Sequence, residues 1–383
     1  MTKRVMCVVG ARPNFMKIAP LMRRLQASAS LEPYLVHTGQ HYDAAMKAAF
    51  FDALRIPEPD EDLGVGSGTH AAQTAEIMRR FEPVLDAEAP AAVLVVGDVN
   101  STIACALVAA KKGVPVVHVE AGLRSFDRSM PEEINRVLTD QLSAALFTTE
   151  RRALDNLARE GVDPDRVHFV GNVMIDTLMD NRARAPSVAQ VLAAVSSHEA
   201  PPERFGVVTL HRPSNVDDPA VLERLLAVLA ELSGELPLLF PLHPRTAARL
   251  EGAGLLARAQ EAGTLLPPLD YLQMLGLLQN ATMVLTDSGG IQEETTALGV
   301  PCLTLRANTE RPITVEQGTN SVVGSDPERI LAAARGVLRD GGKAGRIPEL
   351  WDGQAADRIV AVLENWLDSA VSPTAGPSIA QNY

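Results

Sequence analysis

Val284-Leu-Thr-Asp-Ser-Gly-Gly-Ile-Gln-Glu-Glu294 is the stretch that decides the fold of this 383-residue chain. An apolar run at residues 283–285 indicates the end of a buried strand, and residues 287–290 indicate a turn. From Ile291 onward the spacing of apolar residues predicts a helix, which the Gly-Val-Pro sequence at 299–301 ends. Strand, tight turn and helix in this order are the repeating unit of a parallel α/β sheet.

The turn in this stretch has the chemistry of an anion site. Ser288, Gly289 and Gly290 open a helix, so they leave backbone N–H groups and the positive end of the helix dipole exposed. Such a turn suits a phosphate, while the carboxylates of Glu293 and Glu294 suit a group with hydroxyls, such as a ribose. The alternative is a capped turn whose acids only stabilise the helix dipole, and for the stretch taken alone we favour this structural interpretation.

The same alternation extends along most of the chain. In the first half, strands are predicted at residues 5–9, 34–38, 92–96, 114–119, 145–148 and 167–170, with helices at 17–26, 42–55, 71–85, 102–112, 132–143 and 152–160. The segment 184–204, rich in Ala, Ser and Pro, indicates a domain junction. The pattern then restarts, with strands at 207–210, 238–241, 264–266, 283–285, 302–305 and 322–323 and helices at 219–232, 271–279, 327–338 and 355–367. Since the strands are almost continuously apolar, we expect parallel sheets covered by helices on both faces.

Composition limits the class of protein. A chain of this length predicts two domains. The formal net charge of −12 argues against a nucleic-acid partner, and an aromatic content of 4% argues against stacking on single strands. No apolar run is long enough to span a bilayer, and the N-terminal run is too short for a secretory signal, so no membrane partner is expected.

Cofactor motifs are missing from the sequence. Cys7, Cys105 and Cys302 lie in apolar segments without a Cys-x-x-Cys pair, which predicts core residues in a reducing, cytoplasmic compartment and no metal site. There is no Walker-type Gly-x-x-x-x-Gly-Lys, and no Gly-x-Gly-x-x-Gly opens the first strand–helix unit, so a nicotinamide cofactor is not expected.

Polar residues follow many of the predicted strands, at the edge where parallel sheets bind ligands. They are Arg12, Gln40, His41, Asp98, Asn100 and Glu120 in the first half, and His211, Arg212, His243, Arg245, Asp287, Ser288 and Arg306 in the second. Taken singly, each also fits a structural role, such as a helix cap for a strand-end Asp. Their concentration at one edge favours a site in which the basic groups suit a diphosphate and the carboxylates suit acid–base chemistry. The basic groups are Arg12, Lys17, Arg245 and Arg311, and the carboxylates are Asp98, Glu120, Glu132 and Glu133.

Two adjacent acids, Glu132 and Glu133, follow Pro131 at a predicted helix start. Neighbours on a helix point about 100° apart, so we expect one of them to face a site. Acids are also favoured structurally in a first helical turn, and Arg136 lies within a turn of both and can pair with either.

Nine motifs occur in one order along the chain. They are Gly10-Ala-Arg-Pro13 with Lys17, Gly39-Gln-His41, Gly97-Asp98, Val119-Glu-Ala-Gly-Leu-Arg124, Pro131-Glu-Glu133 with Asn135-Arg136, Leu210-His-Arg212, Pro241-Leu-His-Pro244, Asp287-Ser-Gly-Gly-Ile-Gln-Glu-Glu294 and Glu310-Arg-Pro312. Together they resemble the non-hydrolysing UDP-N-acetylglucosamine 2-epimerases over residues 4–367. The resemblance implies the GT-B architecture, an α/β fold in which two Rossmann-like domains face each other across a cleft. It places the domains at residues 1–183 and 184–354, returns the helix 355–367 to the first domain, and leaves 369–383 as a flexible tail.

The family resemblance also implies an activity. Family members interconvert UDP-N-acetylglucosamine and UDP-N-acetylmannosamine by eliminating UDP to give 2-acetamidoglucal and adding it back. They need no metal or redox cofactor, are typically homodimers, and serve cell-surface polysaccharide biosynthesis. By the motifs, proton transfer falls to Asp98, Glu120 and Glu132, and His211 lies near the leaving group.

The remaining roles follow from the same motifs. The implied UDP-binding residues are Arg12, Lys17, His243, Ser288, Gly289, Gly290, Glu294 and Arg311. Glu294 is expected to bind the ribose, whereas Glu293 is expected to be a solvated acid of the first helical turn. Gln40 and His41 are candidates for a second site at which substrate activates some members of the family.

Several alternatives remain open at this point. Ala11 stands where many bacterial members carry Thr, and Asn14-Phe15 stands where they carry Glu-Ala. Such changes leave room for a related substrate, such as a 2,3-diacetamido uronic acid sugar. A hydrolysing epimerase, a GT-B glycosyltransferase and a non-catalytic nucleotide-sugar sensor are the other hypotheses. The carboxylate set Asp98, Glu120 and Glu132 argues against the last two.

Overall fold

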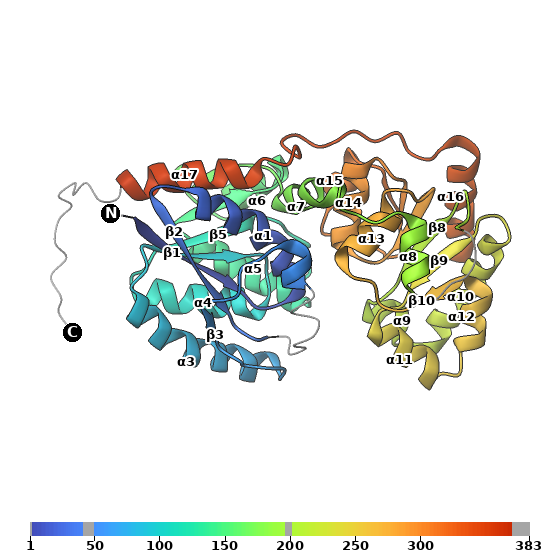
Figure 1. The fold of residues 1–383 in the computed structure, drawn as a ribbon, viewed down its shortest axis with the longest axis horizontal. Coiled ribbons are helices and arrows are strands. Elements are labelled where there is room, and N and C mark those ends of the chain that lie inside the picture. Colours follow the sequence, from blue (N-terminus) through green and yellow to red (C-terminus); the bar gives the residue numbers. More distant parts are fainter. Residues whose placement is uncertain (1, 41–49, 196–200, 370–383) are drawn as a thin grey trace.

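Each half of the chain is built around its own parallel sheet (Figure 1). The computed structural model describes residues 2–40, 50–195 and 201–369, without the side chain of Arg12. The first sheet has the strand order β3-β2-β1-β4-β5-β6-β7 and the second the order β10-β9-β8-β11-β12-β13. In both sheets each strand runs parallel to its paired neighbours.

The first sheet comprises β1 (Lys3–Val9), β2 (Leu31–His37), β3 (Glu61–Asp62), β4 (Ala92–Val96), β5 (Val116–Ala121), β6 (Ala145–Thr148) and β7 (Val167–Phe169). Its helices are α1 (Arg12–Ala27), α3 (His70–Glu88), α4 (Asn100–Lys111), α5 (Pro131–Leu142), α6 (Arg151–Arg159) and α7 (Val173–Arg182), with a short 3₁₀ turn η1 (Pro164–Arg166).

The second sheet comprises β8 (Gly206–Thr209), β9 (Leu238–Pro241), β10 (Thr264–Leu266), β11 (Met283–Thr286), β12 (Cys302–Thr304) and β13 (Asn320–Val322). Its helices are α8 (Val188–Ala194), α9 (Pro213–Val216), α10 (Pro219–Ser233), α11 (Pro244–Gly252), α12 (Leu256–Ala262), α13 (Tyr271–Leu278), α14 (Gly289–Leu298), α15 (Pro312–Glu316) and α16 (Pro327–Asp340). The last helix, α17 (Ala355–Ser369), follows them.

Alternate residues of the central strand β1 face two different helical layers. Val5, Cys7 and Val9 pack in one buried cluster with residues of α1 and α17. Met6 and Val8 pack in another cluster with residues of α3 and α4. Because successive strand residues point to opposite faces, an unbroken apolar strand requires helices on both sides, as the sequence predicted.

The last helix returns to the first half of the chain. In Figure 1, α17 lies over α1, although it follows the second sheet in sequence. Ile359, Leu363 and Leu367 are buried in the same cluster as Leu21 and Leu25 of α1. These contacts support the proposed division of the chain, in which residues 355–367 join the first domain.

Both sheets follow the Rossmann strand order 3-2-1-4-5-6, and the first sheet adds a seventh strand, β7, at its edge. In each sheet the chain therefore changes side between the two central strands, β1 and β4 in the first and β8 and β11 in the second. The loops after these four strands diverge and leave a crevice at the carboxyl edge of each sheet. This arrangement confirms the predicted α/β fold of the GT-B type.

Some predicted elements differ from those observed. Helix α1 begins at Arg12 instead of residue 17, because Pro13 suits the first turn of a helix. Helix α7 was not predicted at all, and the predicted junction 184–204 contains helix α8. Of the helix predicted at 42–55, residues 50–54 are helical, while 41–49 lie outside the described residues, as do residues 370–383 of the predicted tail.

Candidate active site

The predicted site residues of the first half come from the ends of its two central strands and of β5. Gly97 and Asp98 follow β4, and Lys17 reaches the same place from α1. Gly97 has a φ of +66°, and a Cβ at this position would lie 2.7 Å from the Lys17 Nζ atom. A glycine here therefore allows both the tight turn and the close approach of the ammonium group.

Glu120 is the buried centre of a cluster of opposite charges. Its Oε2 lies 2.8 Å from Lys17 Nζ, and its Oε1 accepts a hydrogen bond of 2.8 Å from Arg311 Nη2. Burial on its own would raise the pKa of Glu120, but Lys17 and Arg311 outweigh burial, and the pKa lies below its ordinary value. Glu120 is therefore ionised at neutral pH although it is 4% exposed.

The backbone of Glu120 is strained. Its φ is +74°, in the left-handed region that side chains other than glycine rarely adopt, and the pairing of β5 with β6 shifts register at this residue. Such a conformation costs on the order of 1–3 kcal/mol and persists where the surroundings enforce it. The bulge turns the carboxylate of Glu120 out of the strand and toward the second half of the chain, where it meets Arg311.

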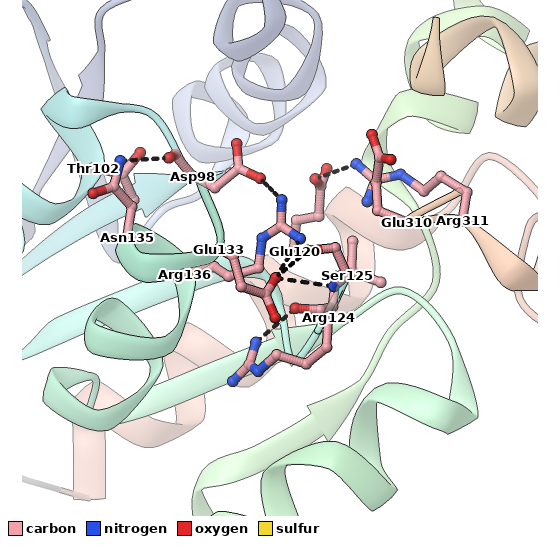
Figure 2. A network of polar contacts seen from close by, with 12 residues as sticks. Asp98, Thr102, Glu120, Arg124, Ser125, Glu133, Asn135, Arg136, Glu310 and Arg311 are labelled. Carbon is pink, nitrogen blue, oxygen red and sulfur yellow. Dashed lines mark hydrogen bonds and ion pairs between the residues drawn. The ribbon is translucent and has the colours of Figure 1, made fainter. Parts of the chain in front are cut away.

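Asp98 lies near Glu120 and is held by α5 (Figure 2). Arg136 Nη2 donates a hydrogen bond of 2.5 Å to Asp98 Oδ2, and Asn135 Nδ2 donates to the Asp98 carbonyl at 2.9 Å. Burial opposes ionisation, but Arg136, Lys17 and Arg311 together hold the pKa of Asp98 below its ordinary value. Two carboxylates thus stay charged side by side because cations surround them.

The two adjacent acids at the start of α5 have separate positions. Glu133 is buried and accepts hydrogen bonds from the backbone N–H groups of Ser125 and Phe126, both 2.9 Å, and from Arg136 Nη1 at 3.0 Å. Glu133 thus ties the 125–126 loop to the arginine that pairs with Asp98. Glu132 is half-buried one position earlier in the same turn.

Asn14, one of the departures from the family pattern, has a structural contact in this region. Its Oδ1 accepts hydrogen bonds from the N–H groups of Gly10 and Ala11, at 3.2 and 3.1 Å. Its Nδ2 donates to the carbonyl of Val96 at 2.9 Å. Asn14 therefore joins the turn after β1 to the end of β4, immediately before Asp98.

Arg311 connects the two halves of the chain, and Glu293 holds it from the other side. Arg311 Nε lies 3.0 Å from Glu293 Oε1, which also accepts a hydrogen bond of 3.0 Å from Asn172. The expectation that Glu293 is a solvated acid is wrong, because the residue is 2% exposed. Burial raises the pKa of Glu293 to about 7, against the opposing charge of Arg311 and together with the charge of Glu120.

In the second half, a buried acid orients His211. Asp287 follows β11 and accepts hydrogen bonds from the backbone N–H groups of His211 and Arg212 and from Asn215 Nδ2, at 2.9–3.1 Å. His211 Nδ1 lies 2.8 Å from Asp287 Oδ1. Since a carboxylate only accepts, the proton of a neutral His211 sits on Nδ1, and Nε2 is the nitrogen turned away from Asp287.

The glycine turn of the opening stretch begins α14. The helix starts at Gly289, and the side chain of Ser288 makes no capping hydrogen bond to it. A Cβ on Gly289 would lie 3.0 Å from Glu310 Oε1, so this glycine lets the chain pass close to a carboxylate that Arg306 and Arg212 neutralise. The Ser288 N–H donates to the Thr286 hydroxyl at 3.0 Å, so the amides of Gly289 and Gly290 are the donors that this helix N-terminus offers to an anion.

Glu294 lies buried one position after Glu293. It interacts with Tyr271 of α13, and burial together with the charge of Glu294 raises the pKa of Tyr271 well above its ordinary value. The sequence offered no signal for the burial of both acids, because Gln292, Thr295 and Thr296 beside them are polar as well.

Three further predicted residues have other positions. His243 caps α11, because its Nδ1 accepts a hydrogen bond from the N–H of Arg245 at 3.2 Å. Its ring lies 5.5 Å from that of His211. Gln40 is buried, and its Oε1 accepts from the N–H and hydroxyl of Ser101 at the start of α4. His41 lies outside the described residues.

No described helix is both long and apolar enough to cross a membrane. A cleft of about 740 Å³ lies between the halves and is lined by Glu150, Arg151, Arg152, Ile313, Glu316 and Glu349 among others. Two ion pairs cross it, Arg151 to Glu349 and Arg152 to Glu316, at 2.7 and 2.8 Å.

The chain matches a family model over residues 23–364, the model of the UDP-N-acetylglucosamine 2-epimerases. It is 41% identical over 336 residues to a UDP-N-acetylglucosamine 2-epimerase of Methanococcus maripaludis, covering 87% of this chain and 91% of the relative. It is 40% identical over 367 residues to a UDP-2,3-diacetamido-2,3-dideoxy-D-glucuronate 2-epimerase of Pseudomonas aeruginosa, covering 94% and 99%.

Solved structures agree with these relatives. The fold superimposes with a TM-score of 0.85 on the crystal structure of the Methanocaldococcus jannaschii UDP-GlcNAc 2-epimerase in complex with UDP-GlcNAc and UDP. That comparison covers 94% of this chain and 99% of the other, at 38% identity. The chain therefore belongs to the UDP-N-acetylglucosamine 2-epimerase family of isomerases.

Proposed function

We propose that this protein interconverts UDP-N-acetylglucosamine and UDP-N-acetylmannosamine without releasing the free sugar. The observation that carries the proposal is the pair of ionised carboxylates, Asp98 and Glu120, surrounded by Lys17, Arg136 and Arg311. They belong to one half of the chain, while the helix N-terminus at Ser288 belongs to the other. An elimination at a nucleotide sugar needs both, a base for the sugar and donors for the departing diphosphate.

In the forward direction the C2–H and C1–O bonds of the sugar break and a C1=C2 double bond forms. A carboxylate takes the C2 proton, and the electron pair of the C1–O bond leaves with UDP, which gives 2-acetamidoglucal. A weakly basic carboxylate suffices, because breaking of the C1–O bond makes the C2 proton acidic. Re-addition of UDP to C1, with a proton delivered to the other face of C2, yields the epimer. We assign the two faces to Asp98 and Glu120 jointly, with Glu132 as a third proton-transfer group.

In this proposal the second half holds most of the leaving group, and Arg12 and Lys17 reach it from the first half. The Ser288 hydroxyl, the amides of Gly289 and Gly290 with the helix dipole, the cations Arg12, Lys17 and Arg311, and the outward Nε2 of His211 stabilise the diphosphate charge. Glu294 accepts hydrogen bonds from the ribose hydroxyls, and His243 borders the site next to His211. We keep Gln40 and His41 as the proposed second site for activation by substrate.

The test is to incubate the purified protein with UDP-N-acetylglucosamine in deuterium oxide and to follow C2 by NMR. Deuterium at C2 of both UDP-linked epimers supports the proposal, because it shows that the C2 proton was lost and that the bond to UDP was then restored. Free N-acetylmannosamine as the main product shows the hydrolysing reaction instead. Absence of exchange in a folded, UDP-binding protein overturns the assignment of this substrate.

A second candidate substrate is UDP-2,3-diacetamido-2,3-dideoxy-D-glucuronate. It is favoured by the Pseudomonas aeruginosa relative, whose identity to this chain is within one per cent of that of the archaeal relative. The same exchange measurement with both sugars, compared by kcat/KM, decides between them. A homodimer in the cytoplasm stays a prediction, and light scattering on the purified protein tests its dimeric state.

A further inference from the structure

A buried polar cluster below the carboxylates has no part in the proposed chemistry. It consists of His118 of β5, Asp140 of α5, Arg124 after β5 and Glu160 at the end of α6. The side chains of His118 and Asp140 are fully buried, and that of Arg124 is 1% exposed. Buried ionisable groups cost free energy, so a cluster of this kind calls for a specific reason.

Every contact of His118 in this cluster is with a hydrogen-bond acceptor. Its Nδ1 lies 2.6 Å from Asp140 Oδ1, and its Nε2 lies 2.8 Å from the carbonyl oxygen of Gly97. Carboxylates and carbonyls only accept hydrogen bonds, so both ring nitrogens must carry protons to make both contacts. His118 can donate both hydrogen bonds at once only as an imidazolium.

The charges of the cluster then balance. Asp140 Oδ2 lies 2.7 Å from Arg124 Nη2, and Arg124 also makes two hydrogen bonds with Glu160, at 2.8 and 2.6 Å. An imidazolium at His118 and the guanidinium of Arg124 then face two carboxylates, the buried Asp140 and the partly exposed Glu160.

The cluster connects the two turns that carry the acid–base residues. His118 holds the carbonyl of Gly97, and the next residue is Asp98. Asp140 Oδ2 accepts a hydrogen bond of 3.1 Å from the N–H of Gly122, two residues after the strained Glu120. Two side chains, His118 and Asp140, therefore join the backbone next to Asp98 to the backbone next to Glu120.

We propose that His118 and Asp140 are positioning residues that fix the separation and direction of the Asp98 and Glu120 carboxylates. Glu120 has a left-handed φ and a bulged strand, so its turn requires an external restraint. Asp98 follows Gly97, and a glycine has more conformational freedom than other residues. The turn by itself therefore does not fix the direction of the Asp98 side chain. The imidazolium–carboxylate pair supplies one rigid restraint to both turns. This inference rests on the proposed function for the roles of Asp98 and Glu120.

The first experiment compares two substitutions of His118. His118→Leu removes both hydrogen bonds, whereas His118→Gln keeps one donor that can reach the Gly97 carbonyl. We expect kcat for epimerisation to fall about 100-fold in His118→Leu, since small misplacement of reacting groups has effects of this size. His118→Gln retains roughly ten-fold more activity than His118→Leu. KM and the affinity for UDP change by less than about three-fold in both variants, because His118 does not contact the proposed nucleotide site.

The matched control is Asp176→Asn. Asp176 is also a buried carboxylate and accepts hydrogen bonds from the backbone N–H groups of Ala355 and Ala356, at 3.1 and 2.7 Å. It holds the start of α17, and within the described part of the chain it makes no hydrogen bond or ion pair with the turns of Asp98 or Glu120. Asp176→Asn lowers the melting temperature but leaves kcat unchanged. If Asp176→Asn lost as much kcat as His118→Leu at an equal loss of stability, the role of His118 would be general and the proposal wrong.

A spectroscopic measurement is independent of turnover. In ¹⁵N-labelled protein, long-range ¹H–¹⁵N correlations show the histidine rings, and the signal that disappears in His118→Gln belongs to His118. Two protonated nitrogens at neutral pH support the proposal, and a neutral ring overturns it. Should His118→Leu not fold, this spectrum and the kcat of His118→Gln decide the question. Wild-type kcat in His118→Gln together with a neutral ring would refute it.

The two proposals fail in different ways. Absence of C2 exchange in the wild-type protein removes the proposed function but leaves the restraint itself testable. In that case a crystal structure of His118→Leu is compared with the wild type. A displaced Asp98 carboxylate supports the inference, and an unmoved one overturns it.

Discussion

The two halves of this protein share a strand order but place their acids in opposite ways. In the first half, Asp98 and Glu120 face outward toward cations that come from α1, α5 and the other half. In the second half, Asp287 points inward and accepts hydrogen bonds from the backbone and from His211. One sheet therefore presents carboxylates, and the other uses a carboxylate to present a histidine.

The difference shows how one fold supports two kinds of chemistry. Both sheets bring strand ends to a crevice, and the residues at those ends decide what the crevice does. A carboxylate surrounded by cations stays ionised and is ready to exchange a proton. A carboxylate buried behind a histidine fixes which ring nitrogen faces the ligand.

The largest effect is expected from the outward carboxylates. Asp98→Asn or Glu120→Gln should reduce C2 deuterium exchange by at least about 1,000-fold, because each removes a proton acceptor. Affinity for UDP, measured by calorimetry, should change by less than about ten-fold, since the nucleotide is assigned to the other half. Near-normal exchange in either variant would make the acid–base assignment wrong.

A smaller effect is expected from Asp287 in the second half, which both orients His211 and accepts hydrogen bonds from the backbone. Asp287→Asn and His211→Asn should each lower kcat roughly 100-fold, because both remove the oriented imidazole. Only Asp287→Asn should lower the free energy of unfolding, by about 1–3 kcal/mol, since it leaves buried backbone N–H groups without a full acceptor. Urea denaturation of the two variants checks the contrast, and equal stabilities would contradict it.

The smallest effect concerns the link between the halves. Burial raises the pKa of Glu293 to about 7, so Glu293 becomes neutral as the pH falls from 8 to 6. Arg311 then has one less anion beside it and is more available to a diphosphate. Between pH 8 and pH 6, we expect the affinity of the wild-type protein for UDP to rise roughly five-fold more than that of Glu293→Gln.

The Glu293→Gln variant serves as its own control in that measurement. The phosphate of UDP titrates in the same range, but it does so equally in both proteins. At pH 8 the variant should bind UDP more tightly than the wild type. An unchanged pH dependence in Glu293→Gln would show that another group is responsible.

Much of the fold followed from local pattern. Strands such as β4 and β9 were predicted at their observed bounds, because short apolar runs between turns have few other structures open to them. Helix α7 was missed because it packs against α1 on one side and α14 on the other. With most of its residues buried, its polar and apolar residues do not separate onto two faces with the helical period. The candidate residues at the strand ends were found because the carboxyl edge of a parallel sheet is known in advance.

The partners of those residues were harder to predict. Arg136 was noted as a partner for Glu132 or Glu133, yet its pairing with Asp98 joins residues 38 positions apart. Arg311 and Glu120 are 191 positions apart. Glu293 was misplaced because a first-turn acid is ordinarily solvated, and only the packing of α14 against α7 covers it.

The sequence by itself determined the α/β alternation, the glycine turn at the start of α14 and the list of polar strand ends. These features depend on residues that are close together in the sequence, so the spacing of those residues is enough to predict them. Only the tertiary structure decided which acids are ionised site residues and which are buried and hold other side chains or the backbone in place. An acid is charged or neutral according to the groups packed around it, and Lys17, Arg136 and Arg311 reach the carboxylates from three separate segments.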